Sequence, residues 1–258
     1  MNLTGRTAVI TGAGRGIGAA TAAALADAGA AVLVSARTRG EVESVAARIK
    51  AKGHKAFATP CDVTRPANVK AMAKVAERHL GPIDILVNNA GIATSAPVRN
   101  LNLADWHRVF EVNATGALLC TQAFLPGMVA RRWGRVINVA SIAGKIGDQY
   151  IAAYAASKHA LIGLTRSLAL EIAEQGVTAN AVCPGYVETP MTSDSIARIM
   201  AKTGAPKEKV RAAIVGKSPQ HRMIGADEVA FLIVALCDER AKGINGQSIV
   251  IDGGGVQA

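Results

Sequence analysis

Aromatic residues are scarce in this sequence: Phe, Trp and Tyr make up 3% of its 258 residues, although half of all residues are hydrophobic. The apolar content therefore comes mainly from Ala, Val, Ile and Leu, which suits a parallel sheet buried between two layers of helices. A chain of this length can bury a large core, and doubly wound α/β folds of this size form one domain.

An apolar N-terminal stretch of signal-peptide length is also missing, and we expect no apolar run of membrane-spanning length without a charge. The longest apolar candidate, residues 151–172, contains Lys158, Arg166 and Glu171, whereas a membrane-spanning helix is predominantly apolar. We expect a soluble, cytoplasmic protein with no membrane partner.

Cysteine is rare and widely spaced. Cys61, Cys120, Cys183 and Cys237 form no CxxC pair, and no histidine cluster accompanies them. Buried free thiols in a reducing compartment are therefore expected rather than disulfides. No His, Cys or carboxylate cluster has the spacing of metal ligands, so we predict no metal site.

Clustered positive charge is missing too, although the net charge is +10. A basic chain favours acidic partners such as nucleic acid, an acidic carrier protein or a phosphorylated small molecule. The densest cluster is only Arg131, Arg132 and Arg135, and few aromatic residues lie near it. The dispersed pattern argues against nucleic-acid binding.

Short β-branched runs alternate with longer Ala-rich stretches along the whole chain. Strands are predicted at residues 7–11, 31–36, 55–60, 83–88, 135–140, 178–183 and 247–251, and helices at 16–28, 39–52, 66–80, 103–130, 151–174 and 226–236. With right-handed crossovers, this order predicts one doubly wound (Rossmann) α/β domain over residues 1–258, with a seven-stranded parallel sheet and helices on both faces. The segment 189–225 carries three prolines and no strand signal, and we expect a mobile lid over the substrate there.

A glycine-rich loop joins the first predicted strand to the first helix. It contains Gly12, Gly14, Arg15, Gly16, Ile17 and Gly18. Glycines let the backbone approach a pyrophosphate, and the helix N-terminus offers free N–H groups to it. A plain glycine-rich turn is the alternative, but the strand–turn–helix context favours a dinucleotide site. The Gly-x-x-x-Gly-x-Gly spacing after Thr11 resembles the short-chain dehydrogenase/reductase family.

The end of the second predicted strand bears on the choice between NAD and NADP. Ala36 stands where NAD enzymes usually place a carboxylate for the ribose 2′-hydroxyl, and Arg37 follows it. Arg15 projects toward the same region, and two guanidinium groups suit a 2′-phosphate. Two solvated surface arginines are the alternative. We predict NADP (NADPH) as the cofactor.

The resemblance implies further cofactor contacts where other strands end. Asp62, with Val63 beside it, would meet the adenine, although Asp62 could instead simply cap its strand. The matching positions after the fourth and sixth strands are Asn89, Ala90, Gly91, Pro184, Gly185, Val187 and Thr189. The final strand matches one that commonly packs at a tetramer interface in the family, so a homotetramer is expected.

Four residues suit carbonyl chemistry, which needs a hydride source, a proton donor and a group that polarises the oxygen. Tyr154 can exchange the proton if a cation lowers its pKa, and Lys158 lies one helical turn later on the same face. Lys158 can also reach the nicotinamide ribose, and Ser141 can hydrogen-bond the substrate oxygen. In the resembled family, an Asn at the position of Asn113 distorts its helix and holds a water in the proton relay. Each residue alone has an ordinary structural explanation, but their order and spacing favour a catalytic set.

The substrate is less constrained by the sequence. Residues 153–159 and 180–191 resemble 3-oxoacyl-thioester reductases, which include acyl-carrier-protein reductases and aromatic polyketide ketoreductases. The predicted substrate contacts are Ser141, Gln149, Tyr154, Tyr186 and Met191. The leading prediction is an NADPH-dependent oxidoreductase that reduces such a ketone to a secondary alcohol.

Several alternatives stay open. Arg131 and Arg132 could meet an acidic carrier protein or coenzyme A, or could simply favour the C-terminal end of their helix. Carrier-dependent relatives often have a basic residue where this chain has Gln175, which counts against a carrier. A dehydrogenase of a cyclic or steroid-like alcohol is the second candidate, and an NADP-binding redox sensor or scaffold is the third. The intact pair of Tyr154 and Lys158 disfavours the sensor.

Overall fold

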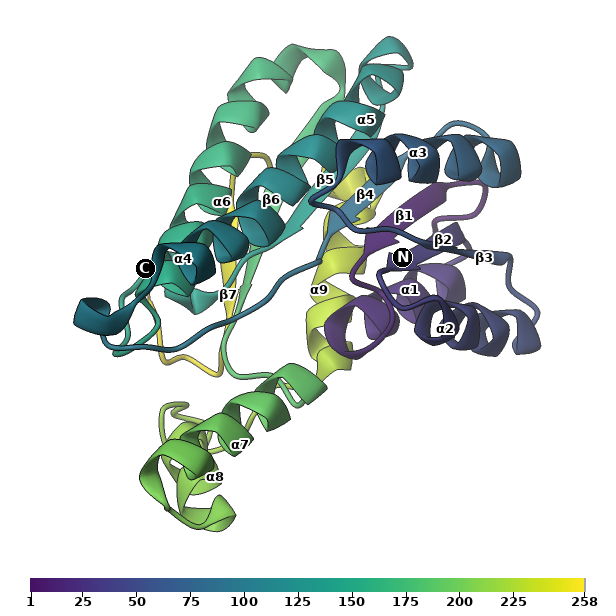
Figure 1. Cartoon of the computed structure of the whole chain (residues 1–258). Coiled ribbons are helices and arrows are strands. Elements are labelled where there is room, and N and C mark those ends of the chain that lie inside the picture. The colour runs from purple at the N-terminus through teal and green to yellow at the C-terminus, as the bar shows by residue number, and fades with distance from the viewer. Residues whose placement is uncertain (258) are drawn as a thin grey trace.

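Runs of β-branched residues form seven parallel strands in one sheet within residues 1–257, the part of the chain that this computed structural model describes. The strands are β1 (Thr7–Thr11), β2 (Ala31–Ala36), β3 (Ala56–Pro60), β4 (Ile85–Asn88), β5 (Gly134–Val139), β6 (Val177–Pro184) and β7 (Ser248–Ile251). Their order in the sheet is β3-β2-β1-β4-β5-β6-β7 (Figure 1). The predicted parallel sheet is confirmed.

The strand order reverses between β1 and β4, which are neighbours in the sheet although they are far apart in the sequence. The chain winds outward from β1 through β2 to β3, then crosses to β4 and winds the other way. In open α/β sheets, ligands bind outside the carboxyl ends of the strands at such a switch point. The loops that follow β1 and β4 therefore mark the expected ligand side of the molecule.

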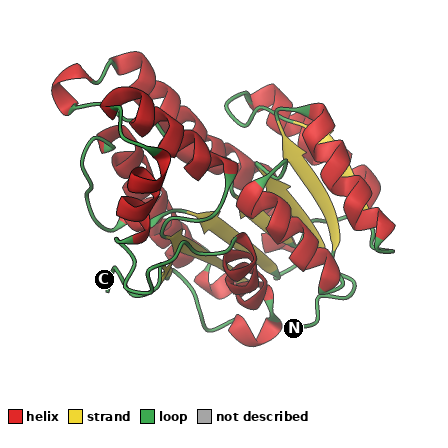
Figure 2. Ribbon diagram, turned by 90° about the horizontal axis from the view of Figure 1, so that it is seen from below, coloured by secondary structure: helices red, strands yellow, loops and turns green. Residues whose placement is uncertain are grey.

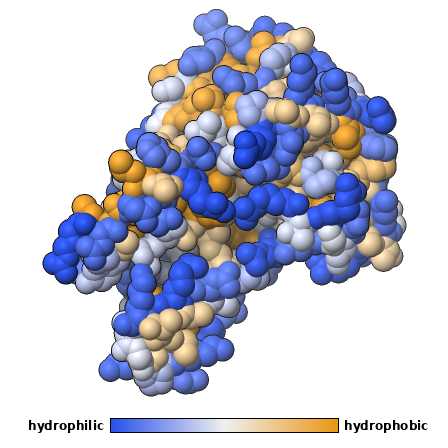
Figure 3. Space-filling model, in the orientation of Figure 1, coloured by the Kyte–Doolittle hydropathy of each residue, from blue (hydrophilic) through white to orange (hydrophobic). Residues whose placement is uncertain are grey.

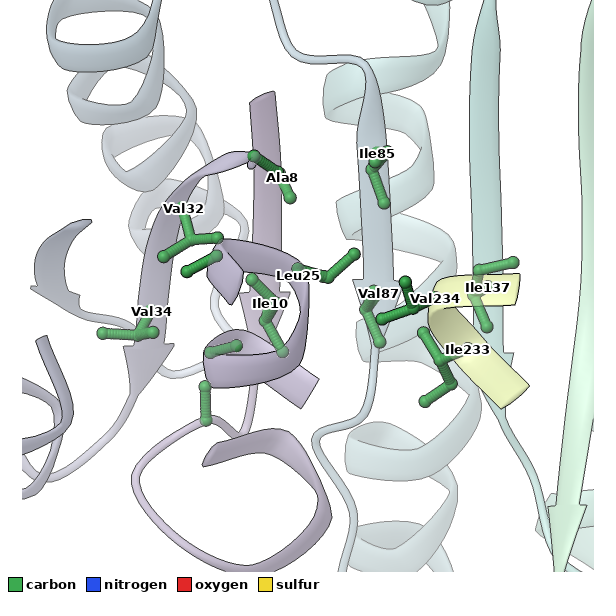
Figure 4. Packing of buried hydrophobic residues seen from close by; sticks show 14 of the residues in the cluster. Ala8, Ile10, Leu25, Val32, Val34, Ile85, Val87, Ile137, Ile233 and Val234 are labelled. Carbon is green, nitrogen blue, oxygen red and sulfur yellow. The ribbon is translucent and has the colours of Figure 1, made fainter. Parts of the chain in front are cut away.

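Helices cover both faces of the sheet, as predicted (Figures 1 and 2). They are α1 (Gly16–Asp27), α2 (Arg39–Ala51) and α9 (Ala226–Cys237) on one face, and α3 (Pro66–Leu80), α4 (Leu103–Phe110), α5 (Gly116–Ala130) and α6 (Ala152–Glu171) on the other. Successive strand residues point to opposite faces. Ile10 therefore packs in a cluster with Leu25 and Ile233 (Figure 4), while Val9 packs with Met72 on the other face.

The predicted helix 103–130 is interrupted by one π-helical turn, Glu111–Thr115, between α4 and α5. This composite helix is also the stretch of the described chain that is long and apolar enough to cross a membrane, by length and composition only. The expectation that residues 151–172 are the longest such candidate was therefore wrong. Cys120, Phe124 and Met128 of α5 are buried against the sheet, as in the core helix of a globular protein.

The segment 189–225 forms two helices, α7 (Pro190–Thr203) and α8 (Lys207–Val215). Pro190 occupies the first turn of α7, where its missing N–H costs nothing. Ile196, Val210, Ile214 and Met223 make a small apolar cluster of their own. Because the segment packs on itself, it stands away from the sheet, as Figure 1 shows.

Candidate active site

The glycine loop after β1 is pressed against the loop after β4. Gly12 has a φ of +63°, and a Cβ there would lie 2.7 Å from Ala90 Cα. A Cβ at Gly18 would lie 2.4 Å from the side-chain nitrogen of Asn89. That nitrogen donates hydrogen bonds to the carbonyl oxygens of Thr11 (2.9 Å) and Gly12 (3.0 Å). Only glycine fits these positions. The close packing of the loops after β1 and β4, called the cradle below, therefore depends on glycines that the sequence analysis identified.

This cradle fits a dinucleotide pyrophosphate. Arg15 is the N-cap of α1 and its side chain makes no capping hydrogen bond, so the first-turn N–H groups from Gly16 and Ile17 onward face the loop without a side-chain acceptor. A Cβ at Gly16 would approach Thr189 Cγ2 to 3.2 Å. The segment after β6 therefore closes over the glycine loop, and Thr189 there caps α7 by accepting from the Thr192 N–H.

The two arginines expected at a 2′-phosphate both face carboxylates. Arg15 is exposed, and its Nη2 lies 3.8 Å from Oδ2 of Asp194 on α7. Arg37 is exposed directly after β2. Partial burial opposes ionisation of Asp62, but hydrogen bonds from Thr64 and the charges of Arg37 and Arg65 hold the pKa of that carboxyl below its usual value.

The strand-end capping role considered for Asp62 is present. Asp62 Oδ1 accepts hydrogen bonds from the Thr64 N–H (3.0 Å) and hydroxyl (2.8 Å). Val63 is buried, and a Cβ at Gly116 would lie 2.6 Å from its Cγ2. The Val63 side chain therefore packs against α5, and any contact with a cofactor falls to its backbone.

Lys158 on α6 is buried beside Tyr154 and is held by the main chain. Its ammonium donates to the Val139 carbonyl at the end of β5 (2.7 Å) and lies 5.7 Å from the centroid of the Tyr154 ring. The side chain is 4% exposed, and this burial lowers the pKa of Lys158 to about 8. The ammonium is therefore placed under the strand ends rather than in solvent.

The phenol of Tyr154 hydrogen-bonds Ser141, which directly follows β5. Burial raises the pKa of Tyr154, and the hydrogen bond to Ser141 opposes that rise. The prediction that Lys158 lowers the pKa of Tyr154 was therefore wrong, because that pKa is raised. The Lys158 ammonium is engaged by a carbonyl, and desolvation of the phenol dominates.

Asn113 lies in the π-helical turn and joins two segments. Its Oδ1 accepts from the Ile92 N–H (2.8 Å), and its Nδ2 donates to the Ile92 carbonyl (3.0 Å) and to Ser157 Oγ (3.0 Å). Ser157 in turn donates to the Tyr154 carbonyl (2.7 Å). The extra residue of the π turn points Asn113 inward, where 1% of it is exposed.

Gly91 completes this group. A Cβ there would lie 3.4 Å from Asn113 Oδ1 and 3.6 Å from Lys158 Nζ. The structure thus brings Asn113, Lys158, Tyr154 and Ser141 together at the carboxyl ends of β4 and β5, as their order in the sequence predicts.

The loop after β6 forms the far side of the site. A Cβ at Gly185 would lie 2.7 Å from Asp252 Cβ, so Pro184 and Gly185 run tightly along the end of β7. Val187 is buried and bridges to Ile224, which joins the two ends of the α7–α8 segment.

The predicted substrate residues separate into two groups. Tyr186 lies near the Tyr154 phenol and affects its ionisation. By contrast, Gln149 is exposed in the loop before α6, and Met191 is 39% exposed at the start of α7. Both side chains therefore lie at the surface rather than beside the Tyr154 phenol.

Arg131 and Arg132, where a carrier contact was suggested, both bind main-chain carbonyls. Arg131 donates to the carbonyl of Ile83 (2.6 Å), before β4 begins, and Arg132 donates to the carbonyl of Glu174 (2.8 Å). These contacts lie at the amino ends of the strands, opposite the edge that carries Tyr154. The arginines satisfy backbone acceptors there.

Several residues escaped the sequence interpretation. The Val139 carbonyl is a main-chain group and leaves no side-chain signal, and Ser157 was only part of the motif around Tyr154. Lys217, at the end of α8, pairs with Asp148 and lies 5.7 Å from the Tyr186 ring. This contact between distant segments has no local pattern.

No three His, Cys, Asp or Glu side chains gather closely enough to hold a metal within residues 1–257. The four cysteines are buried and free. The functional groups that the structure gathers at the site are the Ser141 and Tyr154 hydroxyls, the Lys158 ammonium and the Asn113 amide.

Known proteins resemble this chain over nearly its whole length. A cis-4-hydroxycyclohexanecarboxylate dehydrogenase of Sinomonas cyclohexanicum is 39% identical over 250 residues, which cover 96% of each chain. The 3-oxoacyl-[acyl-carrier-protein] reductase FabG of Escherichia coli (strain K12) is 34% identical over 98% of each chain. A crystal structure of an actinorhodin polyketide ketoreductase variant with NADPH superposes with a TM-score of 0.94, at 34% identity and 97% coverage of each chain.

The family model described as short chain dehydrogenase matches residues 6–199. These matches agree with the order of the strands in the sheet. The chain therefore belongs to the short-chain dehydrogenase family of oxidoreductases, which act on CH–OH and C=O groups with a nicotinamide cofactor.

Proposed function

We propose that this protein is an NADPH-dependent reductase that converts a ketone into a secondary alcohol, with a 3-oxoacyl thioester or polyketide-like substrate. The observation that carries the proposal is the hydrogen bond between Tyr154 and Ser141, set over the buried Lys158. The 3-oxoacyl reductase and polyketide ketoreductase relatives support this substrate class. The structure solved with NADPH and the pair of Arg15 and Arg37 support the cofactor.

In this proposal a bound nicotinamide supplies the hydride. The hydroxyls of Ser141 and Tyr154 converge on one point and hydrogen-bond the substrate oxygen there. Tyr154 then gives its proton to that oxygen. Because burial raises its pKa, Tyr154 keeps its proton until the substrate oxygen accepts it. The Val139 carbonyl holds Lys158 beside the Tyr154 ring, where the ammonium would offset part of the cost of burying the phenolate that forms. Asn113 fixes the neighbouring π turn through Ile92 and Ser157.

The test is oxidation of NADPH or NADH with acetoacetyl-coenzyme A as the ketone. We expect NADPH to be oxidised faster than NADH. In Tyr154→Phe, turnover should fall by about a thousandfold while cofactor binding remains, because the aromatic ring stays but the proton is lost. Full activity of Tyr154→Phe would overturn the mechanism. An NADP-binding sensor or scaffold would bind the cofactor equally in both proteins and turn over in neither.

The dehydrogenase of a cyclic secondary alcohol remains a second candidate, because the cis-4-hydroxycyclohexanecarboxylate dehydrogenase is 39% identical. This candidate is tested in the oxidative direction with cyclic secondary alcohols and NADP. Turnover of these alcohols, with no oxidation of NADPH by acetoacetyl-coenzyme A, would select it over the thioester reductase.

We further propose a cytoplasmic homotetramer whose segment 189–225 is a mobile lid over the substrate. Val98, Leu103 and Leu170 are 73%, 71% and 82% exposed, and apolar side chains interrupt the hydrophilic surface over α4–α6 (Figure 3). Such exposed apolar area favours subunit contacts. Light scattering during size-exclusion chromatography measures the oligomeric state, and a monomer would refute the tetramer.

A further inference from the structure

Glu41, in the first turn of α2, packs directly on the glycine loop. A Cβ at Gly14 would lie 2.6 Å from Glu41 Oε2 and 2.9 Å from Glu41 Cβ. Glycine at position 14 thus leaves the space that the carboxylate fills. Glu41 is half-buried, and within residues 1–257 no Lys or Arg lies within ion-pair distance of it.

The neighbouring charges are already engaged. Arg15, which follows Gly14, faces Asp194 at 3.8 Å. Arg39 pairs with Glu43 at 3.4 Å on the outer side of α2, and the charge of Arg37 acts on Asp62. Glu41 therefore brings a negative charge, uncompensated by a direct partner, to the loop that the proposed cofactor would contact.

A 2′-phosphate held by Arg15 and Arg37 would lie in the same region, since one arginine adjoins Gly14 and the other precedes α2 by two residues. Like charges a few Å apart near a protein surface repel appreciably, and salt screens the effect. NADH carries no 2′-phosphate and would escape this repulsion. The carboxylate missing from position 36 is thus replaced by one that reaches the loop from α2.

We propose that Glu41 is a specificity-determining residue that repels the 2′-phosphate and so narrows the preference for NADPH over NADH. This inference rests on the proposed nicotinamide-dependent function. It assigns to Glu41 a role that motif spacing does not reveal.

The test is direct titration of NADPH and NADH with the purified protein, followed by the fluorescence of the reduced nicotinamide. Glu41→Gln keeps the shape of the side chain and removes its charge. We expect the Kd for NADPH to fall about tenfold at low salt and the Kd for NADH to change less than about twofold. The gain should shrink as ionic strength rises.

Glu43→Gln is the matched control, because it removes the same charge from the same helix turn but from the side that pairs with Arg39. It should leave both Kd values unchanged. Thermal unfolding of all three proteins checks that α2 is intact.

The outcomes separate the two proposals. An unchanged NADPH-to-NADH affinity ratio in Glu41→Gln, with wild-type binding intact, overturns the role of Glu41 and leaves the proposed function standing. Weaker NADH binding with unchanged NADPH binding would show Glu41 holding the ribose hydroxyl and would also overturn repulsion. A wild-type protein that binds neither dinucleotide would refute the proposed function and this inference together.

Discussion

The proposed site has two ends, which hold their charges in opposite ways. The reacting end lies around Tyr154 and Lys158, and the end expected to bind the adenosine lies around Arg15 and Arg37. At the reacting end, Lys158 is 4% exposed and donates to the Val139 carbonyl, and Asn113 makes three hydrogen bonds to fixed partners. At the adenosine end, the Arg15 and Asp194 side chains are 58% and 56% exposed and lie 3.8 Å apart.

This difference corresponds to two proposed tasks, catalysis at the buried end and the choice of cofactor at the exposed end. A buried charge is tolerated only where fixed groups satisfy it, so its geometry is rigid and its removal is costly. Exposed pairs contribute little to stability because water and salt screen them. If the proposed function holds, substitutions at the adenosine end should change the cofactor preference with little effect on the fold, and substitutions at the reacting end should lower activity.

The largest effect is expected at the reacting end, in Lys158→Met. Removing the ammonium takes away the charge that lies 5.7 Å from the centroid of the Tyr154 ring, and kcat for ketone reduction should fall about a thousandfold. Steady-state kinetics with NADPH measure this loss, and Lys207→Met, on the exposed start of α8, should keep wild-type activity. A loss below about tenfold would mean that the buried charge has no catalytic role.

The same residue predicts a pH-dependent stability difference. Burial lowers the pKa of Lys158 from 10.5 to about 8, so between these values the unfolded chain binds a proton that the folded chain does not. The free energy of unfolding of the wild type should therefore rise with pH in this window, relative to Lys158→Met, by about 3 kcal/mol. Below pH 8 both states hold the proton and the burial penalty is constant.

Denaturant unfolding of both proteins at pH 7.5 and pH 10.5 measures this change, and the difference between them cancels the titration of groups that they share. A gap between the two proteins that stays constant with pH would show that the Lys158 ammonium is not penalised by burial.

A smaller effect is expected for Asn113→Ala. The substitution leaves the Ile92 N–H and carbonyl without their partner in a buried site, which should lower the free energy of unfolding by about 2 kcal/mol. The melting temperature should fall by about 6 °C. Calorimetry measures this shift, and Asn100→Ala, at an exposed position, serves as the control. An unchanged melting temperature would indicate that the π turn holds its shape without Asn113.

The same contrast explains what the sequence could predict. The alternation of strands and helices predicted the sheet. Ser141 was recognised at a strand end, and Tyr154 and Lys158 were recognised from their spacing on one helix face. Asn113 required the resemblance, since a polar residue in a long helix has no signature of its own. The π turn became visible only with its contacts to Ile92 and Ser157.

The adenosine end was harder to predict because its contacts join segments far apart in the sequence. The sequence identified Arg15 and Arg37 as candidates for binding a phosphate. It gave no sign that Asp194 on α7 would face Arg15 or that Asp62 after β3 would lie near Arg37. Glu41 lies only a few residues beyond Arg37, yet its contact with Gly14 depends on how α2 packs on the loop. The main-chain acceptors of Arg131 and Arg132 were missed for the same reason, because helix position alone does not tell which edge of the sheet a side chain reaches.

The smallest effect is expected for Asp194→Asn, at the adenosine end. The ion pair with Arg15 is long and exposed, so its loss should change the free energy of unfolding by less than about 0.5 kcal/mol. The freed Arg15 should lower the Kd for NADPH about twofold. This gain is weaker than in Glu41→Gln, because Glu41 packs on Gly14 of the loop whereas Asp194 lies 3.8 Å from the Arg15 side chain. Fluorescence titration with NADPH and NADH measures both. If Asp194→Asn instead weakened NADPH binding, Asp194 would be holding Arg15 in place for the phosphate, and the exposed end would depend on a fixed contact as the buried end does.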